Sequence, residues 1–140
     1  MWICQSKSIP PPAPLKISNI TLERVSVFKL LGVWVQDNLK WNCQVSTIVS
    51  KANKRIYHLT VCRKANLPTD VGLTLFCSKI RPVLEYAAPI WRGLPKYLED
   101  EIQHVQDRCL DIIGLPRNSL HSLALRREIF TQRELQRIIS

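Results

Sequence analysis

Hydrophobic and polar residues alternate in three short runs near the start of the chain, and this period of two predicts β-strands. Residues 15–18 and 21–25 alternate, and 28–35 forms a third, more apolar run. Asn19 is a suitable turn residue, and Gly32 would let another backbone or a ligand approach the third strand closely. Three short strands in succession predict an antiparallel meander over 15–37.

The hydrophobic period lengthens after the turn signal Asp37-Asn38, where a long helix is expected over 42–65. Its apolar residues recur at helical spacing and form one stripe, made of Val45, Ile48, Val49, Ala52, Ile56 and Leu59. Four basic residues fall outside that stripe, namely Lys51, Lys54, Arg55 and Lys64. We therefore expect a basic face turned towards solvent.

A second helical segment is expected after Leu67-Pro68, with Thr69 as its N-cap. It runs to about residue 80, and Pro82 then kinks or restarts it because proline has no backbone N–H to donate. The segment continues to residue 91, and one of its faces is expected to pack in the core through Leu84, Ala87 and Trp91.

Two more helices are expected in the last third of the chain. Residues 98–113 carry an apolar stripe that ends at Gly114, a strong helix stop, and 120–140 is also helical. Glu99-Asp100-Glu101 falls in the first turn of the third helix, where carboxylates suit the helix dipole, so we interpret it as capping and not as a metal or catalytic site.

These patterns predict an α+β, mostly α fold, with a short antiparallel β-meander followed by a bundle of about four helices. Four regions are expected: a proline-rich extended lead-in (1–14), the meander (15–37), the helical bundle (38–114) and the truncated start of a C-terminal helical connector (115–140). Length fits one domain, and no run is long and apolar enough for a membrane span or a signal peptide. We expect a soluble intracellular protein, nuclear or cytoplasmic.

The positive charge of the chain is concentrated in one segment. The net charge is +9, and residues 38–66 contribute +6 without a single acidic residue, whereas 68–118 sum to −1. A solvated helix surface normally mixes both signs, so a one-signed segment favours an anionic partner such as nucleic acid over a plain solvated face.

The five cysteines stand at 4, 43, 62, 77 and 109 and form no CxxC pair. An odd number without paired spacing indicates small buried thiols and not a disulfide framework. His58 and Cys62 are four residues apart and could share a zinc ion, but no second pair stands at ligand spacing. We expect no cofactor and no metal in this chain.

Four stretches of the chain carry recognisable motifs: FKLLGVWVQDNLKW at 28–41, KANKRI at 51–56, RPVLEYA with Ile90-Trp91 at 81–91, and the helix at 101–113. Together they resemble one family, the reverse transcriptases of non-LTR (LINE-type, jockey-like) retrotransposons. FKLLGVWVQDNLKW at 28–41 is similar to the family's FKYLGV-type motif, and KANKRI at 51–56 to its KKANKRL-type run. RPVLEYA at 81–87 with Ile90-Trp91 resembles the RPxLEYA…W signature, and 101–113 the EXXQ-like helix that follows it. The resemblance covers about residues 15 to 139.

The resemblance implies a primer-grip hairpin, a thumb and the start of a connector, which would hold a template–primer duplex (RNA–DNA or DNA). Lys29 and Gly32 would lie at the grip. Five cations would face phosphates: Lys51, Lys54, Arg55, Arg63 and Lys64. No membrane or small-molecule substrate is implied.

The resemblance also implies what this chain lacks. The parent polymerase needs paired palm aspartates and divalent metal ions, with magnesium as the expected one, but this chain has no adjacent Asp-Asp pair. We expect a catalytically incomplete fragment, not an enzyme alone, whose partners include the missing palm and fingers.

Two other classes stay open. One is a helical protein-interaction module or domesticated remnant, whose basic helix meets an acidic protein. The other follows from a resemblance to segments catalogued as the N-terminal region of AlkB-homologue dioxygenases. That chemistry needs an HxD…H iron site, which His58, His104 and His121 do not provide because two residues separate His104 from Asp107.

Overall fold

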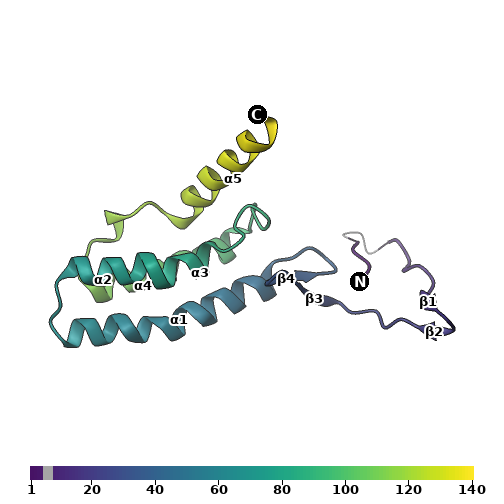
Figure 1. Cartoon of the computed structure of the whole chain (residues 1–140), viewed down its shortest axis with the longest axis horizontal. Helices are drawn as coiled ribbons and strands as arrows, with labels where there is room; N and C mark the ends of the chain where they lie inside the picture. Colours follow the sequence, from purple (N-terminus) through teal and green to yellow (C-terminus); the bar gives the residue numbers. More distant parts are fainter. Residues whose placement is uncertain (5–7) are drawn as a thin grey trace. The chain divides into compact units, whose positions relative to one another are not determined.

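The computed structural model describes residues 1–4 and 8–140, so part of the expected lead-in lies outside the described residues. The chain divides into two compact units, Met1–Gln44 and Val45–Ser140. Figure 1 shows two small hairpins in the first unit and the helices of the second. The fold class is the expected one, α+β and mostly α.

The strands of the first unit form two separate hairpins, so the predicted meander is wrong. Strand β1 (Lys16–Ile17) pairs with β2 (Ile20–Thr21), and β3 (Val27–Leu30) pairs with β4 (Val33–Gln36). Both pairs are antiparallel, and each forms its own two-stranded sheet. The apolar run expected as one strand over 28–35 folds back on itself.

Both hairpins turn through two residues of positive φ. Ser18 and Asn19 have φ of 47° and 67°, and Leu31 and Gly32 have 48° and 85°. Two consecutive positive φ angles are typical of the type I′ turn, whose twist matches that of the strands. Asn19 is thus the turn residue that was predicted, whereas Gly32 lies in a turn and not within a strand.

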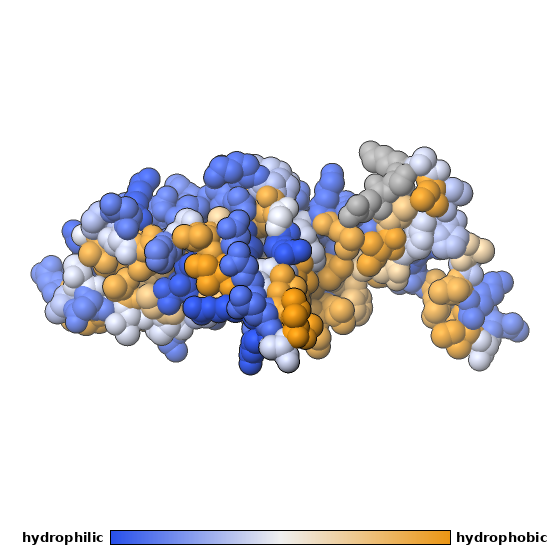
Figure 2. Space-filling view, turned by 90° about the horizontal axis from the view of Figure 1, so that it is seen from above, coloured by the Kyte–Doolittle hydropathy of each residue, from blue (hydrophilic) through white to orange (hydrophobic). Residues whose placement is uncertain are grey.

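The β1–β2 hairpin has one wholly apolar face. Ile17 lies opposite Ile20, and the backbone N–H of Leu22 donates to the carbonyl of Leu15 at 2.8 Å, which extends the pairing by one step. Residues two apart share a face of a strand, so these four side chains point the same way. All four are exposed, and Figure 2 shows hydrophobic residues on the surface of the first unit.

Helix α1 (Asn42–Lys64) closely matches the predicted long helix. Within the second unit its buried residues are those of the predicted stripe, Val45, Ile48, Ala52, Ile56 and Leu59, with Val49 half-buried. The core that contains this stripe also includes buried side chains from later parts of the unit, among them Phe76 of the second helical segment and Trp91 of the turn that follows it. Apolar burial on one face therefore fixes which face of α1 meets solvent.

The second helical segment continues across Pro82 by changing its geometry. Helix α2 (Thr69–Leu75) passes into a π-helical turn η1 (Phe76–Ile80) and then into α3 (Arg81–Glu85). Gly72, Phe76, Ile80 and Leu84 are all buried, each four residues after the last. Four residues overshoot an α-helical turn by about 40°, and the wider π turn offsets that drift.

Three expectations for this segment are corrected. Pro68 and not Thr69 precedes the first helical residue, and no side chain caps this end. The helix stops at Glu85, because Ala87 takes a positive φ of 55° and residues 86–90 form turns. Ala88 is consequently buried in place of the half-buried Ala87, whereas Leu84 and Trp91 are buried as expected.

Helices α4 (Lys96–Ile113) and α5 (Leu123–Ile139) complete the second unit, and the short 3₁₀ turn η2 (Arg117–Ser119) lies between them. Gly114 ends α4 with φ of 90°, as predicted. Helix α5 begins at residue 123, slightly later than expected, and Ser122 caps it. Among the described residues, no helix is long and apolar enough to cross a membrane.

Candidate nucleic-acid interface

Three lysines of α1 present free positive charge to solvent. Lys51, Lys54 and Lys64 are exposed, and none of them makes an ion pair with any residue in the described part of the chain. The 23 residues of α1 include no aspartate or glutamate. No intrahelical carboxylate therefore screens these lysines, and the solvent-exposed face of α1 can attract phosphates over about a Debye length.

Arg55 lies on the edge of this face and contacts the second helical segment of the same unit. Its guanidinium donates to the backbone carbonyl of Lys79, in the π-helical turn η1 just before Pro82. This hydrogen bond ties α1 to the second helical segment. Arg55 is still an exposed cation, so its expected contact with phosphate stays a prediction. The residue also has a structural role through its bond to Lys79.

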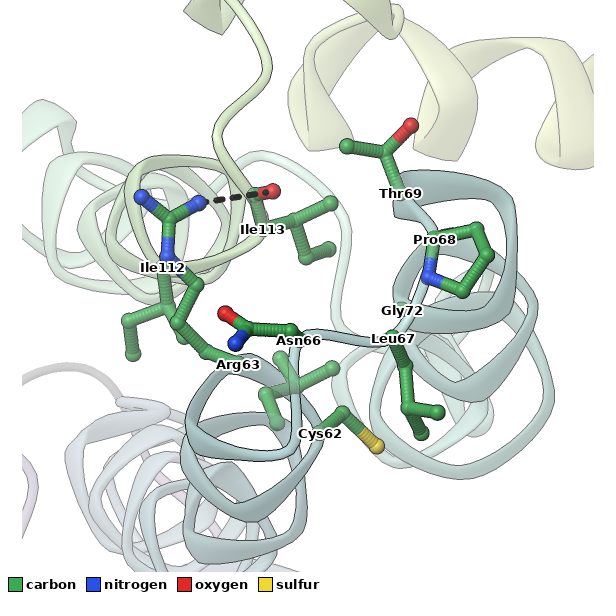
Figure 3. A pocket seen from close by; sticks show the side chains of 10 residues that line it. Cys62, Arg63, Asn66, Leu67, Pro68, Thr69, Gly72, Ile112 and Ile113 are labelled. Atoms are coloured by element: carbon green, nitrogen blue, oxygen red, sulfur yellow. Dashed lines mark hydrogen bonds between the residues drawn. The ribbon is translucent and has the colours of Figure 1, made fainter.

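Arg63 turns towards the end of α4. Its Nη1 donates to the carbonyl of Ile113 at 3.4 Å, as the dashed line in Figure 3 shows. A Cβ at Gly114 would lie 2.7 Å from the same nitrogen, so this glycine leaves room for the guanidinium and also supplies the positive φ. Of the five cations expected to face phosphates, Arg55 and Arg63 are thus partly engaged inside the unit.

A cavity of about 230 Å³ lies beside Arg63, where α1 ends and α2 begins. Its wall is partly apolar, from Leu59 and Ile113, and partly polar, from Arg63 and Asn66 (Figure 3). Gly72 also borders the cavity. A Cβ at this position would come within 3.2 Å of Ile113, so the glycine leaves room for the Ile113 side chain. We assign the cavity no ligand.

Lys29 and Gly32, the two residues expected at a primer grip, belong to the β3–β4 hairpin of the first unit. Lys29 stands opposite Trp34 across the hairpin, with its ammonium 5.6 Å from the ring centroid, a cation–π distance. Gly32 is in the exposed turn. The hairpin is joined to the first turn of α1 by glutamines: Gln36 accepts from the Cys43 N–H at 3.2 Å, and Gln44 from the Trp34 N–H at 3.0 Å.

The sequence analysis did not predict that Arg126 and Arg127 of α5 form ion pairs with carboxylates. Arg126 donates bidentate hydrogen bonds to the Glu85 carboxylate, with Nη2 at 3.1 Å from Oε2. Its Cζ also lies over the Phe130 ring, 5.2 Å from the centroid. Arg127 is almost fully buried, bonds Glu99 at 3.1 Å and lies over the ring of Trp91 at 4.8 Å. No local pattern could reveal these contacts, because the partners are 41 and 28 residues away.

The environments of the two arginines shift their pKa values in opposite directions. The hydrogen bond that Arg126 donates to Glu85 raises the pKa of Arg126, whereas burial lowers the pKa of Arg127 even though Glu99 opposes the shift. Arginine stays protonated in proteins, so both side chains are cations at neutral pH. Their charge is used within the unit to hold α5.

Two glutamines of α4 also hold the start of α5. Gln103 accepts from the Leu123 N–H at 3.0 Å, and Gln106 donates to the carbonyl of His121 at 3.1 Å. The first bond satisfies one of the backbone donors that a helix N-terminus leaves free. The glutamines of the EXXQ-like helix therefore have a structural role here.

Cysteine, histidine, aspartate and glutamate are the side chains that most often bind metal ions. Residues 1–4 and 8–140 contain no group of three or more such side chains that could hold a metal ion. None of the five cysteines, all of which are described, is in a disulfide; Cys109 is buried and the others are half-buried. Burial raises the pKa of Cys109 to about 12, which keeps this thiol protonated.

Comparison of the chain with protein-family models, with curated proteins and with solved structures found no match.

Proposed function

We propose that this chain holds a nucleic-acid duplex by its phosphate backbone, with α1 as the contacting helix. The observation that carries the proposal is the uniform charge of α1: five basic residues, no acidic one, and three exposed lysines without an ion pair among the described residues. Cationic side chains along one helix suit contact with phosphates, which positions a duplex without reading its sequence.

The proposal includes the origin suggested by the sequence motifs. The chain would be a catalytically incomplete piece of a non-LTR retrotransposon reverse transcriptase, comprising a primer-grip-like hairpin and a thumb-like helical bundle. The motif residues support this role in two ways. Lys51 and Lys54 of the KANKRI run are exposed on α1, and Glu85 of the RPVLEYA run braces the bundle through Arg126. Polymerisation would require aspartates that another part of a polymerase supplies.

The test is the salt dependence of binding to a fluorescent RNA–DNA hybrid, followed by anisotropy. A variant with Lys51, Lys54 and Lys64 all replaced by glutamine should bind more weakly. Its slope of log K against log salt should be shallower by about 0.9 for each phosphate that the variant no longer neutralises. Arg55 and Arg63 are left unchanged because their bonds to the Lys79 and Ile113 carbonyls would confound affinity with stability.

A matched control replaces three exposed cations on other elements, Lys16, Lys96 and Arg137, with glutamine. This variant removes the same net charge but leaves α1 intact, and it should keep most of the affinity and slope. If both triple variants lose affinity equally, the attraction is a property of net charge and not of α1. Stronger binding to an acidic polypeptide than to the hybrid would favour the protein-interaction module instead.

A further inference from the structure

The outer side of α1 carries an aromatic residue among its lysines. Lys54, Tyr57, Val61 and Lys64 follow one another at spacings of three, four and three residues, so they line one face of the helix. This face lies away from the buried stripe that contains Ile56. Two cations therefore flank an exposed, apolar and aromatic centre, over a rise of about 15 Å.

Tyr57 is available for contact at this centre. Its side chain is 68% exposed, and the neighbouring Val61 is 45% exposed. The ring meets His58 edge-on, with centroids 6.0 Å apart and an interplanar angle of 66°, and its hydroxyl has no hydrogen-bond partner in the described part of the chain. With 68% of the residue exposed, much of the ring stays accessible to a flat ligand.

We propose that this face binds an unpaired nucleic-acid strand, with one base stacked on Tyr57 and the phosphates on either side near Lys54 and Lys64. The inference rests on the proposed function. It extends that function from a duplex to the unpaired strand that continues beyond the end of the duplex. Proteins that bind single strands without sequence preference combine these two features, cations along the backbone and aromatic rings under the bases.

The positive charge around Tyr57 favours a nucleic acid over a protein as the ligand of this face of α1. An exposed tyrosine and valine could also dock on an apolar protein surface, but lysines on both sides and the lack of any carboxylate on α1 favour a polyanion. A second exposed tyrosine lies in the opposite setting: Tyr97, 59% exposed, precedes Glu99, Asp100 and Glu101 on α4. Carboxylates there would repel phosphates, which makes Tyr97 a matched control.

The experiment measures anisotropy of a labelled single strand of about 12 nucleotides, within the usual site sizes, and of a blunt RNA–DNA hybrid of the same sequence. Tyr57→Leu removes the aromatic ring but keeps an apolar, helix-favouring side chain. We expect it to weaken strand binding by about fivefold to a hundredfold, the range of one base–aromatic stack, and to leave hybrid binding unchanged. Tyr57→Phe and Tyr97→Leu should both bind the strand like the unaltered chain.

A 2-aminopurine base in the strand gives a second measurement, because stacking on Tyr57 should quench its fluorescence in the complex and Tyr57→Leu should restore it. Unchanged strand affinity in Tyr57→Leu overturns the inference while salt-dependent hybrid binding leaves the proposed function standing. Equal weakening in Tyr57→Leu and Tyr97→Leu also overturns it, since the effect would then not belong to this face. If the unaltered chain binds neither nucleic acid, both proposals fail together.

Discussion

Helices α1 and α5 are both rich in basic residues, yet the two helices use that charge differently. Lysines of α1 stand exposed without ion pairs among the described residues, whereas Arg126 and Arg127 of α5 each pair with a glutamate and cover an aromatic ring. Helix α1 is held mainly by an apolar stripe, so its three exposed lysines are available to a ligand. Helix α5 is held partly by its cations, so it has fewer to offer. The number of basic residues in a helix therefore does not measure its affinity for anions.

The largest effect is expected from removing the carboxylate that pairs with the buried arginine of α5. Glu99→Ala would leave the Arg127 guanidinium buried without its partner, which should lower the free energy of unfolding by about 3 kcal/mol. Chemical denaturation measures this change.

The control for that change is Glu101→Ala on the same turn of α4. Glu101 is exposed and makes no ion pair with any residue that the structure describes, so its removal should alter the free energy of unfolding by less than about 0.5 kcal/mol. Equal destabilisation by the two variants would contradict the assignment of Arg127 as an internal cation.

A smaller effect is expected at the start of α5. The Oγ of Ser122 accepts from the Leu125 N–H at 3.2 Å, so Ser122→Ala should cost about 1 kcal/mol of unfolding free energy. Ser50→Ala, at an exposed position inside α1, should by contrast be neutral or slightly stabilising, because alanine favours the helix interior. Thermal unfolding followed by circular dichroism compares them, and unchanged stability in Ser122→Ala would mean that Gln103 alone suffices as the cap.

The smallest effect is expected from neutralising α1. Replacing Lys51, Lys54 or Lys64 singly with glutamine should change the free energy of unfolding by no more than about 0.5 kcal/mol, because these side chains are exposed and unpaired in the described chain. Denaturant titration of each variant checks this. A destabilisation well above that size would show that the lysine is committed to the fold, and the contrast with α5 would then fail.

Local patterns were sufficient to predict the presence of α1, α4 and α5 and the buried face of α1, but not the end of the second helical segment at Glu85. The spacing of Ile48, Ala52 and Ile56 predicted the buried side of α1, and Gly114 predicted where α4 stops. The hairpin turn at Leu31-Gly32 escaped prediction because leucine rarely takes a positive φ, so the run looked like a single strand. This turn costs the chain local strain and leaves Leu31 86% exposed at the tip.

For the candidate interface, the sequence predicted which cations lie on α1 but not which of them are engaged. Lys51, Lys54 and Lys64 are exposed as expected. The bonds of Arg55 and Arg63 to backbone carbonyls depend on helix ends and on a π-helical turn that come together only in the folded unit. Interactions between distant parts of the chain leave no periodic signal, so local patterns could not have revealed them.

The π-helical turn Phe76–Ile80 bears on how the length of this chain can vary in evolution. A turn closed by bonds between residues five apart holds one residue more than an α-helical turn. If the exposed Ser78 were deleted, the steps between buried residues 72, 76, 80 and 84 would become four, three and four, which is the ordinary α-helical spacing. In most buried helices, deletion of one residue rotates the following side chains away from the core. In this segment, deletion within the π-helical turn would keep the buried side chains on the same face.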